Sequence, residues 1–339
     1  MKKYIFPILI MIITLAVFFH YIPLERIPEI PKQIHVRGIG LGFLFYLLSY
    51  IFVAMRWRLL FVEGLGHKFK CPLPLLTVIT SAHQFYANIL PVRTGDLTIV
   101  YLARRHLGIE GSKGMTSLII ARAMDVIMLG FLALFFIVWQ RHNTKLMHPG
   151  ALSCAVLFIS IPILGVVSAI LWGKRIAGWI DDHVTRFLAR RGSHLLLRIA
   201  GFLSRTARLL SERKSLAFYS KCAVFSLAIM VLRISYLTAF ATHAATPVEP
   251  LSAPLVGLST LIVSTTPLQG FMGMGAFEGG WVLGYALVGL STTEGLMTAV
   301  NAHLLVIFFL LLLGSLSNLI LFNRKPVKFV GDESKKTPF

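Results

Sequence analysis

The chain has 339 residues, of which 56% are hydrophobic and only 14% charged, and its formal net charge is +19. Soluble domains average about 25% charged residues, so this composition and the several apolar runs of about 20 residues exclude an ordinary soluble globule. The basic residues flank apolar segments, which favours topology and contact with anionic lipid over nucleic-acid binding. We therefore expect an all-α, polytopic membrane protein whose partners are membrane lipids, most simply anionic phospholipid, and not nucleic acid.

The apolar segments, taken in chain order, predict about six full spans and two interrupted ones. The first, residues 4–22, resembles a signal peptide, but no small-residue cleavage site follows it, so we interpret it as a retained span. The span over residues 38–60 closes on Arg56, Trp57 and Arg58, a pattern typical of a headgroup-level tryptophan between snorkelling arginines. The remaining full spans are predicted at residues 115–139, 151–172, 222–243 and 297–322.

Two further apolar segments carry helix breakers and are predicted to be broken or re-entrant. In lipid a helix tolerates Gly and Pro at this density only where protein or a water-filled cavity covers the break. Residues 72–107 turn near residues 91–96, and residues 254–290 are interrupted at residues 265–280. The residues expected to form the flexible breaks are Pro91, Gly95, Pro267, Gly270, Gly273 and Gly275.

Residues 173–214 differ from the rest because apolar residues recur there at helical spacing between arginines. Two amphipathic helices broken near Gly192 and lying on the membrane surface fit this pattern. The alternative is a soluble helical hairpin that packs on the cytoplasmic ends of the spans.

Charge bias predicts the topology. If residues 72–107 dip in from the cytoplasm and return, 25 Lys and Arg residues lie inside and 5 outside, as the positive-inside rule requires. Both termini are then cytoplasmic, in the inner membrane of the cell. The chain reads as one membrane domain whose halves, residues 1–139 and 151–322, form an inverted repeat, followed by a polar tail over residues 323–339.

Ionisable residues inside membrane segments are costly and are therefore candidates for function. Arg93, Arg122 and Arg233, with Arg56 at an edge, could bind a lipid headgroup phosphate. The acidic residues Asp96, Asp125 and Glu278 would then be counterions or proton carriers.

Structural alternatives exist for these residues. Arg122 and Asp125 are three apart and could form an ion pair that holds one helix. Asp96 could cap the helix that follows it, and Glu278 could cap or hydrogen-bond the broken backbone. His83 and His303 are expected to be packed or hydrogen-bonded within the bundle, with a ligand role as the alternative.

Catalytic and metal-binding motifs find little support. The chain has no GxSxG, HExxH or P-loop sequence, and its three cysteines, Cys71, Cys154 and Cys222, have no metal-ligand spacing. The spacing GxxGxG from Gly270 to Gly275 lacks the strand-helix context of a dinucleotide site. We expect no metal and no cofactor.

Four short motifs follow one another along the chain. They are Arg56-Trp57-Arg58-Leu59-Leu60, then Asn88 to Asp96, then Arg122-Ala123-Met124-Asp125, then Pro267 with the Gly-rich sequence and Glu278. In this order they resemble the lysylphosphatidylglycerol synthase transmembrane-region family over about residues 5–322. One departure is Ala121, where the family often has Glu.

The resemblance implies a stand-alone flippase domain that moves a phospholipid or lipid-linked headgroup between leaflets, without aminoacyl-transferase activity. Two alternatives stay open at this point. One is a membrane-embedded polyprenyl-phosphate glycosyltransferase, since some relatives carry such names. The other is an interaction subunit of an envelope lipid or glycan assembly system.

Overall fold

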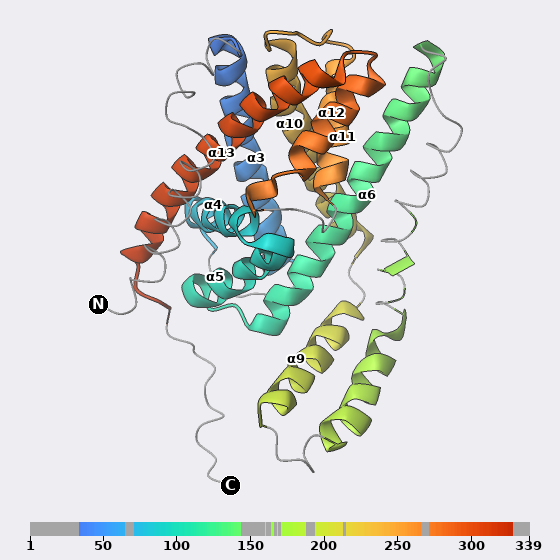
Figure 1. The fold of residues 1–339 in the computed structure, drawn as a ribbon. Coiled ribbons are helices and arrows are strands. Elements are labelled where there is room, and N and C mark those ends of the chain that lie inside the picture. Colours follow the sequence, from blue (N-terminus) through green and yellow to red (C-terminus); the bar gives the residue numbers. More distant parts are fainter. Residues whose placement is uncertain are drawn as a thin grey trace. The chain divides into compact units, whose positions relative to one another are not determined.

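The computed structural model describes residues 34–64, 71–143, 160, 164–165, 168, 171–187, 194–212, 215–265 and 271–327 (Figure 1). Within these ranges the regular structure is helical, apart from one isolated bridge between Ile34 and Ala244. The predicted all-α class is therefore confirmed. The predicted span at residues 4–22, most of the span at 151–172, and the tail after residue 327 lie outside the described residues.

Four described helices are long and apolar enough to cross a bilayer, so the chain is a multi-pass membrane protein. Each begins before the first residue of the span predicted for it. Ser215 starts one of them, since its hydroxyl accepts the Phe218 N–H at 3.1 Å. The helices are α3 (Val36–Val62), α6 (Gly111–Asn143), α10 (Leu216–Thr242) and α13 (Thr292–Phe322).

Both predicted interruptions are present as breaks in helical structure. The first consists of α4 (Leu73–Ile89), the 3₁₀ segment η2 (Pro91–Leu97) and α5 (Thr98–Leu107). A Cβ on Gly95 would lie 2.2 Å from the carbonyl oxygen of Tyr86, so this close return of the chain requires glycine. Short helices on either side of a break are what the Gly and Pro content predicts.

The second interruption separates α11 (Ala253–Ser264) from α12 (Ala276–Leu287). The short 3₁₀ segment η4 (Phe271–Gly273) precedes α12, and Pro267 and Gly270 lie outside the described residues. The backbone then passes through left-handed conformations at Gly273 (φ 85°) and Gly275 (φ 83°). Residues other than glycine rarely adopt these backbone angles, which explains the Gly-rich sequence here.

The chain divides into two compact units. Unit 1 consists of residues 1–49, 84–95 and 231–319, and unit 2 of residues 50–83, 96–230 and 320–339. The helices α3, α4, α10 and α13 each contribute residues to both units. The predicted inverted halves, 1–139 and 151–322, stay a prediction.

Unit 1 is held together by close helix packing. The helices α11 and α12 lie side by side (Figure 1), and a Cβ on Gly280 or Gly284 would lie 2.6 or 2.5 Å from an α11 Cα atom. Ser259 of α11 donates its hydroxyl to the carbonyl of Gly280 at 2.8 Å. Small residues with a four-residue spacing are a common means of bringing membrane helices together. Further along unit 1, aromatic rings pack edge to face, as between Tyr46 and Tyr236 at 5.3 Å.

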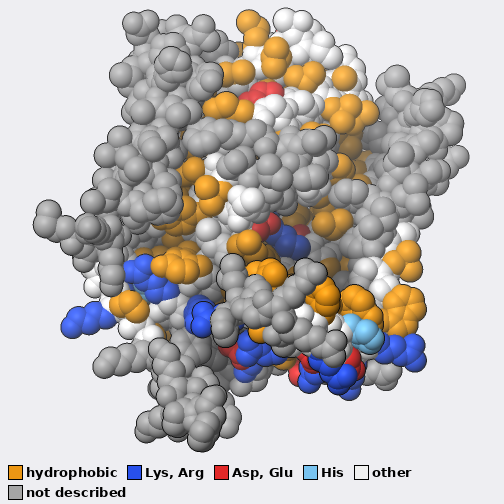
Figure 2. Space-filling view, turned by 60° about the horizontal axis from the view of Figure 1, so that its bottom comes forward, with side chains coloured by type: hydrophobic (Ala, Val, Ile, Leu, Met, Phe, Trp, Pro, Cys, Tyr) orange, Lys and Arg blue, Asp and Glu red, His pale blue; other side chains and the backbone are white. Residues whose placement is uncertain are grey.

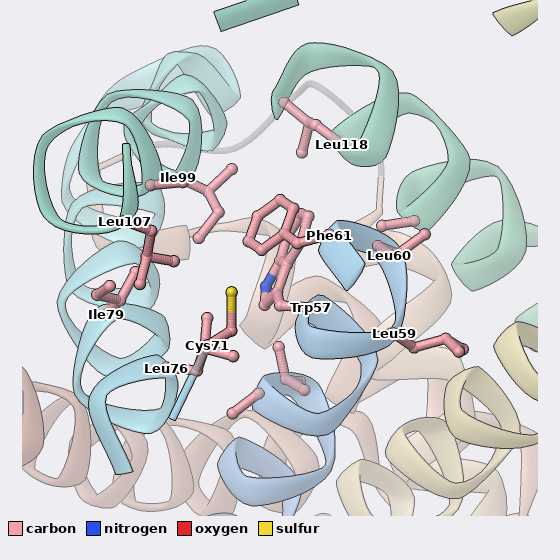
Figure 3. Close-up of a cluster of buried hydrophobic side chains, with 14 of the residues drawn as sticks. Trp57, Leu59, Leu60, Phe61, Cys71, Leu76, Ile79, Ile99, Leu107 and Leu118 are labelled. Atoms are coloured by element: carbon pink, nitrogen blue, oxygen red, sulfur yellow. The ribbon is translucent and has the colours of Figure 1, made fainter. Parts of the chain in front are cut away.

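Unit 2 has a hydrophobic core that includes side chains from α3, α4, α5 and α6 (Figure 3). The Trp57 ring is only 2% exposed and stacks on Phe61, with ring centroids 5.4 Å apart. Arg56 is 3% exposed, whereas Arg58 is exposed. The prediction of a headgroup-level tryptophan between two snorkelling arginines is therefore wrong for Trp57 and Arg56. Their neighbours Phe61 and Leu60 are buried too, which shows that this end of α3 is covered by protein.

The predicted amphipathic pair is present in unit 2 as a helix over residues 171–187 and α9 (His194–Leu210), and Gly192 between them lies outside the described residues. The first helix contains a π segment, η3 (Ile180–Thr185). Ser204 of α9 donates to the carbonyl of Ala177 at 3.4 Å, so the two helices pack together. Trp172, Trp179 and other apolar side chains of the pair are exposed. Their place at the membrane surface stays a prediction.

Candidate functional site

Unit 2 contains a network of four charged side chains, two basic and two acidic, centred on α6. Arg56 of α3 binds Asp125 of α6 through both terminal nitrogens, and Nη2 lies 3.2 Å from Oδ2. The Nη1 atom of Arg56 also donates to the hydroxyl of Ser226 at 2.9 Å. Both charged residues are buried. In a bidentate pair of this kind each residue neutralises the charge of the other, and an unpaired charge would be very costly in an apolar interior.

Arg122 lies between two carboxylates of the same network. Its Nη2 donates to Asp96, which lies near the end of η2, and its Nη1 is 3.7 Å from Oδ2 of Asp125. The Arg122 side chain is 30% exposed, compared with 4% for Arg56. The predicted pairing of Arg122 with Asp125 is confirmed, but Asp125 has its closer partner in Arg56. Arg122 is thus the accessible cation of the network, and it ties α6 to the first helix break.

Asp96 does not cap the following helix. The N-cap position of α5 is Leu97, with no side-chain cap hydrogen bond. The alternative reading of Asp96 as a helix cap is therefore wrong, because its carboxylate is directed to the Arg122 guanidinium instead.

Other polar atoms in unit 2 are buried without a hydrogen-bond partner in the described part of the chain. Buried polar groups are almost always hydrogen-bonded, so these atoms are exceptions within a largely apolar unit. The atoms are Arg56 Nε, Trp57 Nε1, Thr80 Oγ1, Ser81 Oγ, His106 Nδ1, Ser117 Oγ and Arg122 Nε.

Unit 1 contains a second polar cluster, at the break before α12. Glu278 accepts the Gly275 N–H at 2.7 Å, so its predicted role in hydrogen-bonding the broken backbone is confirmed. The other carboxylate oxygen of Glu278 lies 2.5 Å from Nδ1 of His303, on α13. The His303 ring stacks on Phe277, with centroids 4.3 Å apart. His303 is therefore packed and hydrogen-bonded, as predicted, and so is His83, whose Nδ1 is 3.0 Å from the Thr98 hydroxyl.

The remaining predicted residues are placed less specifically. Arg233 is half-buried on α10 in unit 1. The side chains of Pro91 and Arg93 lie outside the described part, as do Pro267 and Gly270. A cavity shared by Arg93, Arg122 and Arg233 therefore stays a prediction.

Two titratable groups outside the four spans have shifted pKa values. Burial, together with the nearby cations Arg105 and Arg324, lowers the pKa of His106 to about 4. Burial raises the pKa of the Cys71 thiol, against the opposing influence of Arg58. His106 is therefore held neutral and Cys71 is an unreactive thiol at neutral pH.

The chain matches the lysylphosphatidylglycerol synthase TM region over residues 4–314. It belongs to that family. The match covers most of the 339 residues, so the membrane region forms nearly the whole of this chain. No curated protein matched the chain.

For this member of the lysylphosphatidylglycerol synthase transmembrane-region family, the structure unites motifs that lie far apart in the sequence. Arg56, Asp96 and the Arg122 to Asp125 motif all belong to the unit 2 network. Ala121, the position where the family often has Glu, is 2% exposed and packs in the hydrophobic core. The described residues contain no group of three or more His, Cys, Asp or Glu side chains placed to hold a metal ion.

In this family member, sequence reasoning missed Ser226, and it named His303 without identifying Glu278 as its partner. Ser226 is 170 residues from Arg56 and carries no motif of its own, so no signal pointed to it. The contact of His303 with Glu278 could have been suspected, since a histidine inside an apolar span needs a polar partner.

Proposed function

We propose that this protein moves a phospholipid or a lipid-linked headgroup between the leaflets of the cell membrane. The observation that carries the proposal is the position of Arg122, a partly exposed cation between two carboxylates beside a helix break. Membership of the family supports a lipid substrate, since lysylphosphatidylglycerol is itself a membrane lipid. The acyl chains would stay in the bilayer while the headgroup passes through the protein.

Arg122 supplies the chemistry for recognising a phosphate. A guanidinium binds phosphate oxygens in the same fork geometry that it uses for a carboxylate. A headgroup phosphate would displace Asp96 from Nη2 of Arg122, while Arg56 continues to hold Asp125 in place. Arg56 is buried and its terminal nitrogens are engaged, so we assign it to positioning Asp125 and not to the headgroup.

Displacing Asp96 would also act on the backbone. Asp96 belongs to η2, a 3₁₀ segment between α4 and α5, and 3₁₀ hydrogen bonds have poorer geometry than those of an α-helix. Phosphate binding would release the tie between η2 and α6, so that headgroup entry and movement of the first break become one event. The buried unpartnered polar atoms of unit 2 would give the headgroup further hydrogen-bonding sites.

Charge bias supports the orientation that this transport requires. With both termini in the cytoplasm, 25 basic residues face inside and 5 face outside. Lys, Arg, Asp and Glu side chains gather beside exposed hydrophobic ones on the face shown in Figure 2. Such a surface suits contact with anionic headgroups.

The proposal is tested by scrambling of a fluorescent anionic phospholipid in proteoliposomes. Arg122→Ala should lower the scrambling rate at least about tenfold, the effect of losing one charge-assisted contact of about 1.5–3 kcal/mol. Arg122→Lys should keep part of the rate, because the charge remains without the fork. Arg186→Ala is the matched control, since it removes an exposed ion pair with Asp182 in the helix over residues 171–187. This variant should scramble lipid at the wild-type rate.

A wild-type rate no faster than that of empty liposomes would overturn the proposal. Turnover of a sugar donor by the purified protein would replace it with the transferase function, and specific co-purification of an envelope protein with an inactive transporter would replace it with an assembly role.

A further inference from the structure

His303 has both ring nitrogens in contact with hydrogen-bond acceptors. Its Nε2 lies 3.1 Å from the carbonyl oxygen of Met272, and its Nδ1 lies 2.5 Å from a carboxylate oxygen of Glu278. His303 is 4% exposed, and the ring is covered by Phe277. These contacts determine how many protons the cluster holds.

A carbonyl oxygen can only accept, so Nε2 must carry a hydrogen. In a neutral imidazole Nδ1 then has a lone pair, which would face the lone pairs of an ionised Glu278 oxygen at 2.5 Å. A contact this short requires a hydrogen between the two atoms. The pair therefore binds one shared proton, either as imidazolium with carboxylate or as neutral imidazole with carboxylic acid. Either state has no net charge.

Among the described residues, few other charges face this pair. Glu278 accepts the Gly275 N–H at the start of α12 and contacts His303 on α13. On α13, Glu294 is exposed nine residues earlier, and on α12 the Tyr285 hydroxyl is bonded to Thr246. Loss of the shared proton would therefore leave a negative charge in a largely covered site, with no second cation paired to Glu278 in the described part of the chain.

The same contacts hold the second helix break to α13. Met272 has φ 56°, a left-handed conformation that is unfavourable for a side chain of its type, and its carbonyl is bound by His303. Met272 itself is only 2% exposed. Because Glu278 also accepts the Gly275 N–H, the Glu278–His303 pair links three points: the turn at Met272, the start of α12, and α13.

We propose that Glu278 and His303 form a proton-binding site, and that the bound proton latches the Met272 to Gly275 turn against α13. When the proton leaves, the contact between Nδ1 and the carboxylate becomes repulsive, the hydrogen bond to Met272 weakens, and the turn opens. A role of this site in coupling transport to protons rests on the proposed function. The existence of the proton-binding site does not. The site would let a proton gradient bias the movement of the second break.

Isosteric substitution separates the proton from the shape of the site. In Glu278→Gln the amide can donate to Nδ1 of a neutral ring, so the latch stays closed without a titrating proton. In Glu278→Ala the partner is gone and the latch should be open at every pH. Glu278→Gln also keeps the size of the side chain, which guards against a result caused by misfolding.

The first measurement is the proton itself, by nuclear magnetic resonance of ¹⁵N-histidine-labelled protein in nanodiscs. A far-downfield proton signal coupled to a histidine nitrogen should be present at neutral pH and disappear as the pH rises. It should be absent in both Glu278→Gln and His303→Gln. The control His83→Gln should keep the signal. The partner of His83 is the Thr98 hydroxyl, which can donate or accept, so this contact does not require a shared proton. A signal that persists in Glu278→Gln, or that never appears in the wild type, overturns the proton site.

The second measurement is the opening of the turn, read from thiol modification of Met272→Cys in a background without the native cysteines. After correction with the exposed Gly279→Cys, modification should rise at least about tenfold between a pH at which the proton signal is present and a pH at which it has disappeared, because each pH unit changes proton occupancy up to tenfold. Adding Glu278→Gln should abolish the rise, and adding Glu278→Ala should give fast modification at both pH values. Protection that does not depend on pH in any variant overturns the latch.

Failure of the proposed transport would look different. Both measurements would then succeed while lipid scrambling stays at the background rate.

Discussion

Removing one partner of the buried Arg56–Asp125 pair should destabilise the protein more than removing both. Arg56→Met leaves the Asp125 carboxylate, 6% exposed, beside Arg122, whose Nη1 is 3.7 Å from Oδ2 of Asp125. Leaving a buried charge without its bonded partner costs about 3–5 kcal/mol, and the contact with Arg122 places this case at the lower end of that range. Asp125→Leu should cost a similar amount because, among the described residues, Ser226 is then the remaining hydrogen-bond partner of the buried Arg56 guanidinium.

The double variant Arg56→Met/Asp125→Leu buries no unpaired charge in α3 or α6. We expect it to lose only about 1 kcal/mol, so the coupling between the two sites should be about 3 kcal/mol or more. Unfolding in mixed micelles of rising sodium dodecyl sulfate content can be followed with a thiol-reactive dye. Cys71 and Cys222 report it, since they are 4% and 1% exposed in the folded protein.

An exposed ion pair provides the matched control. Lys221 and Glu63 are 2.8 Å apart, with side chains 54% and 48% exposed. A pair in water contributes about 0–1 kcal/mol, so its own cycle should give a coupling near zero. A coupling for Arg56 and Asp125 as small as that of the control would refute the view that this pair is a buried structural ion pair.

Four further predictions concern other parts of the chain. The free energy of unfolding in detergent should fall by up to about 2 kcal/mol between pH 7 and pH 5. His106 gains a proton near pH 6.5 in the unfolded protein, whereas burial lowers its pKa in the folded protein to about 4. In His106→Gln the free energy of unfolding should change less over this pH range. Gly284→Val should cost about 1–3 kcal/mol in the same unfolding assay, because its Cβ would lie 2.5 Å from an α11 Cα atom, and an unchanged midpoint would contradict the close packing. In a single-tryptophan variant, brominated lipids should quench Trp179, which is 58% exposed; absence of quenching would favour the soluble hairpin. Finally, membrane-impermeant reagents should reach Thr94→Cys and Gly279→Cys from opposite sides, and access from one side would exclude the inverted repeat.

Much of the architecture follows from local properties of the sequence. Apolar length predicts the spans at α3, α6, α10 and α13, because a helix in lipid must satisfy its own backbone over the thickness of the hydrocarbon. Gly and Pro content predicts both breaks, including the turn at Gly95, since these residues disfavour a continuous helix whatever surrounds them. The charged residues in the spans could be identified as exceptional for the same reason, as each is costly in lipid.

The partners of those charges could not be read from the sequence. Spacing along one helix predicts Arg122 with Asp125, but Asp125 binds Arg56, 69 residues away, because packing brings α3 and α6 together in unit 2. Packing also decides which end of a span is covered by protein. For this reason Arg56 and Trp57, which were expected at the membrane surface, are buried. Hydrophobicity and backbone propensity depend on residues that are close together in the sequence. The choice of a charged partner depends instead on which helix faces meet. The sequence by itself determined where the membrane helices run and break; the tertiary structure alone decided which charges neutralise one another.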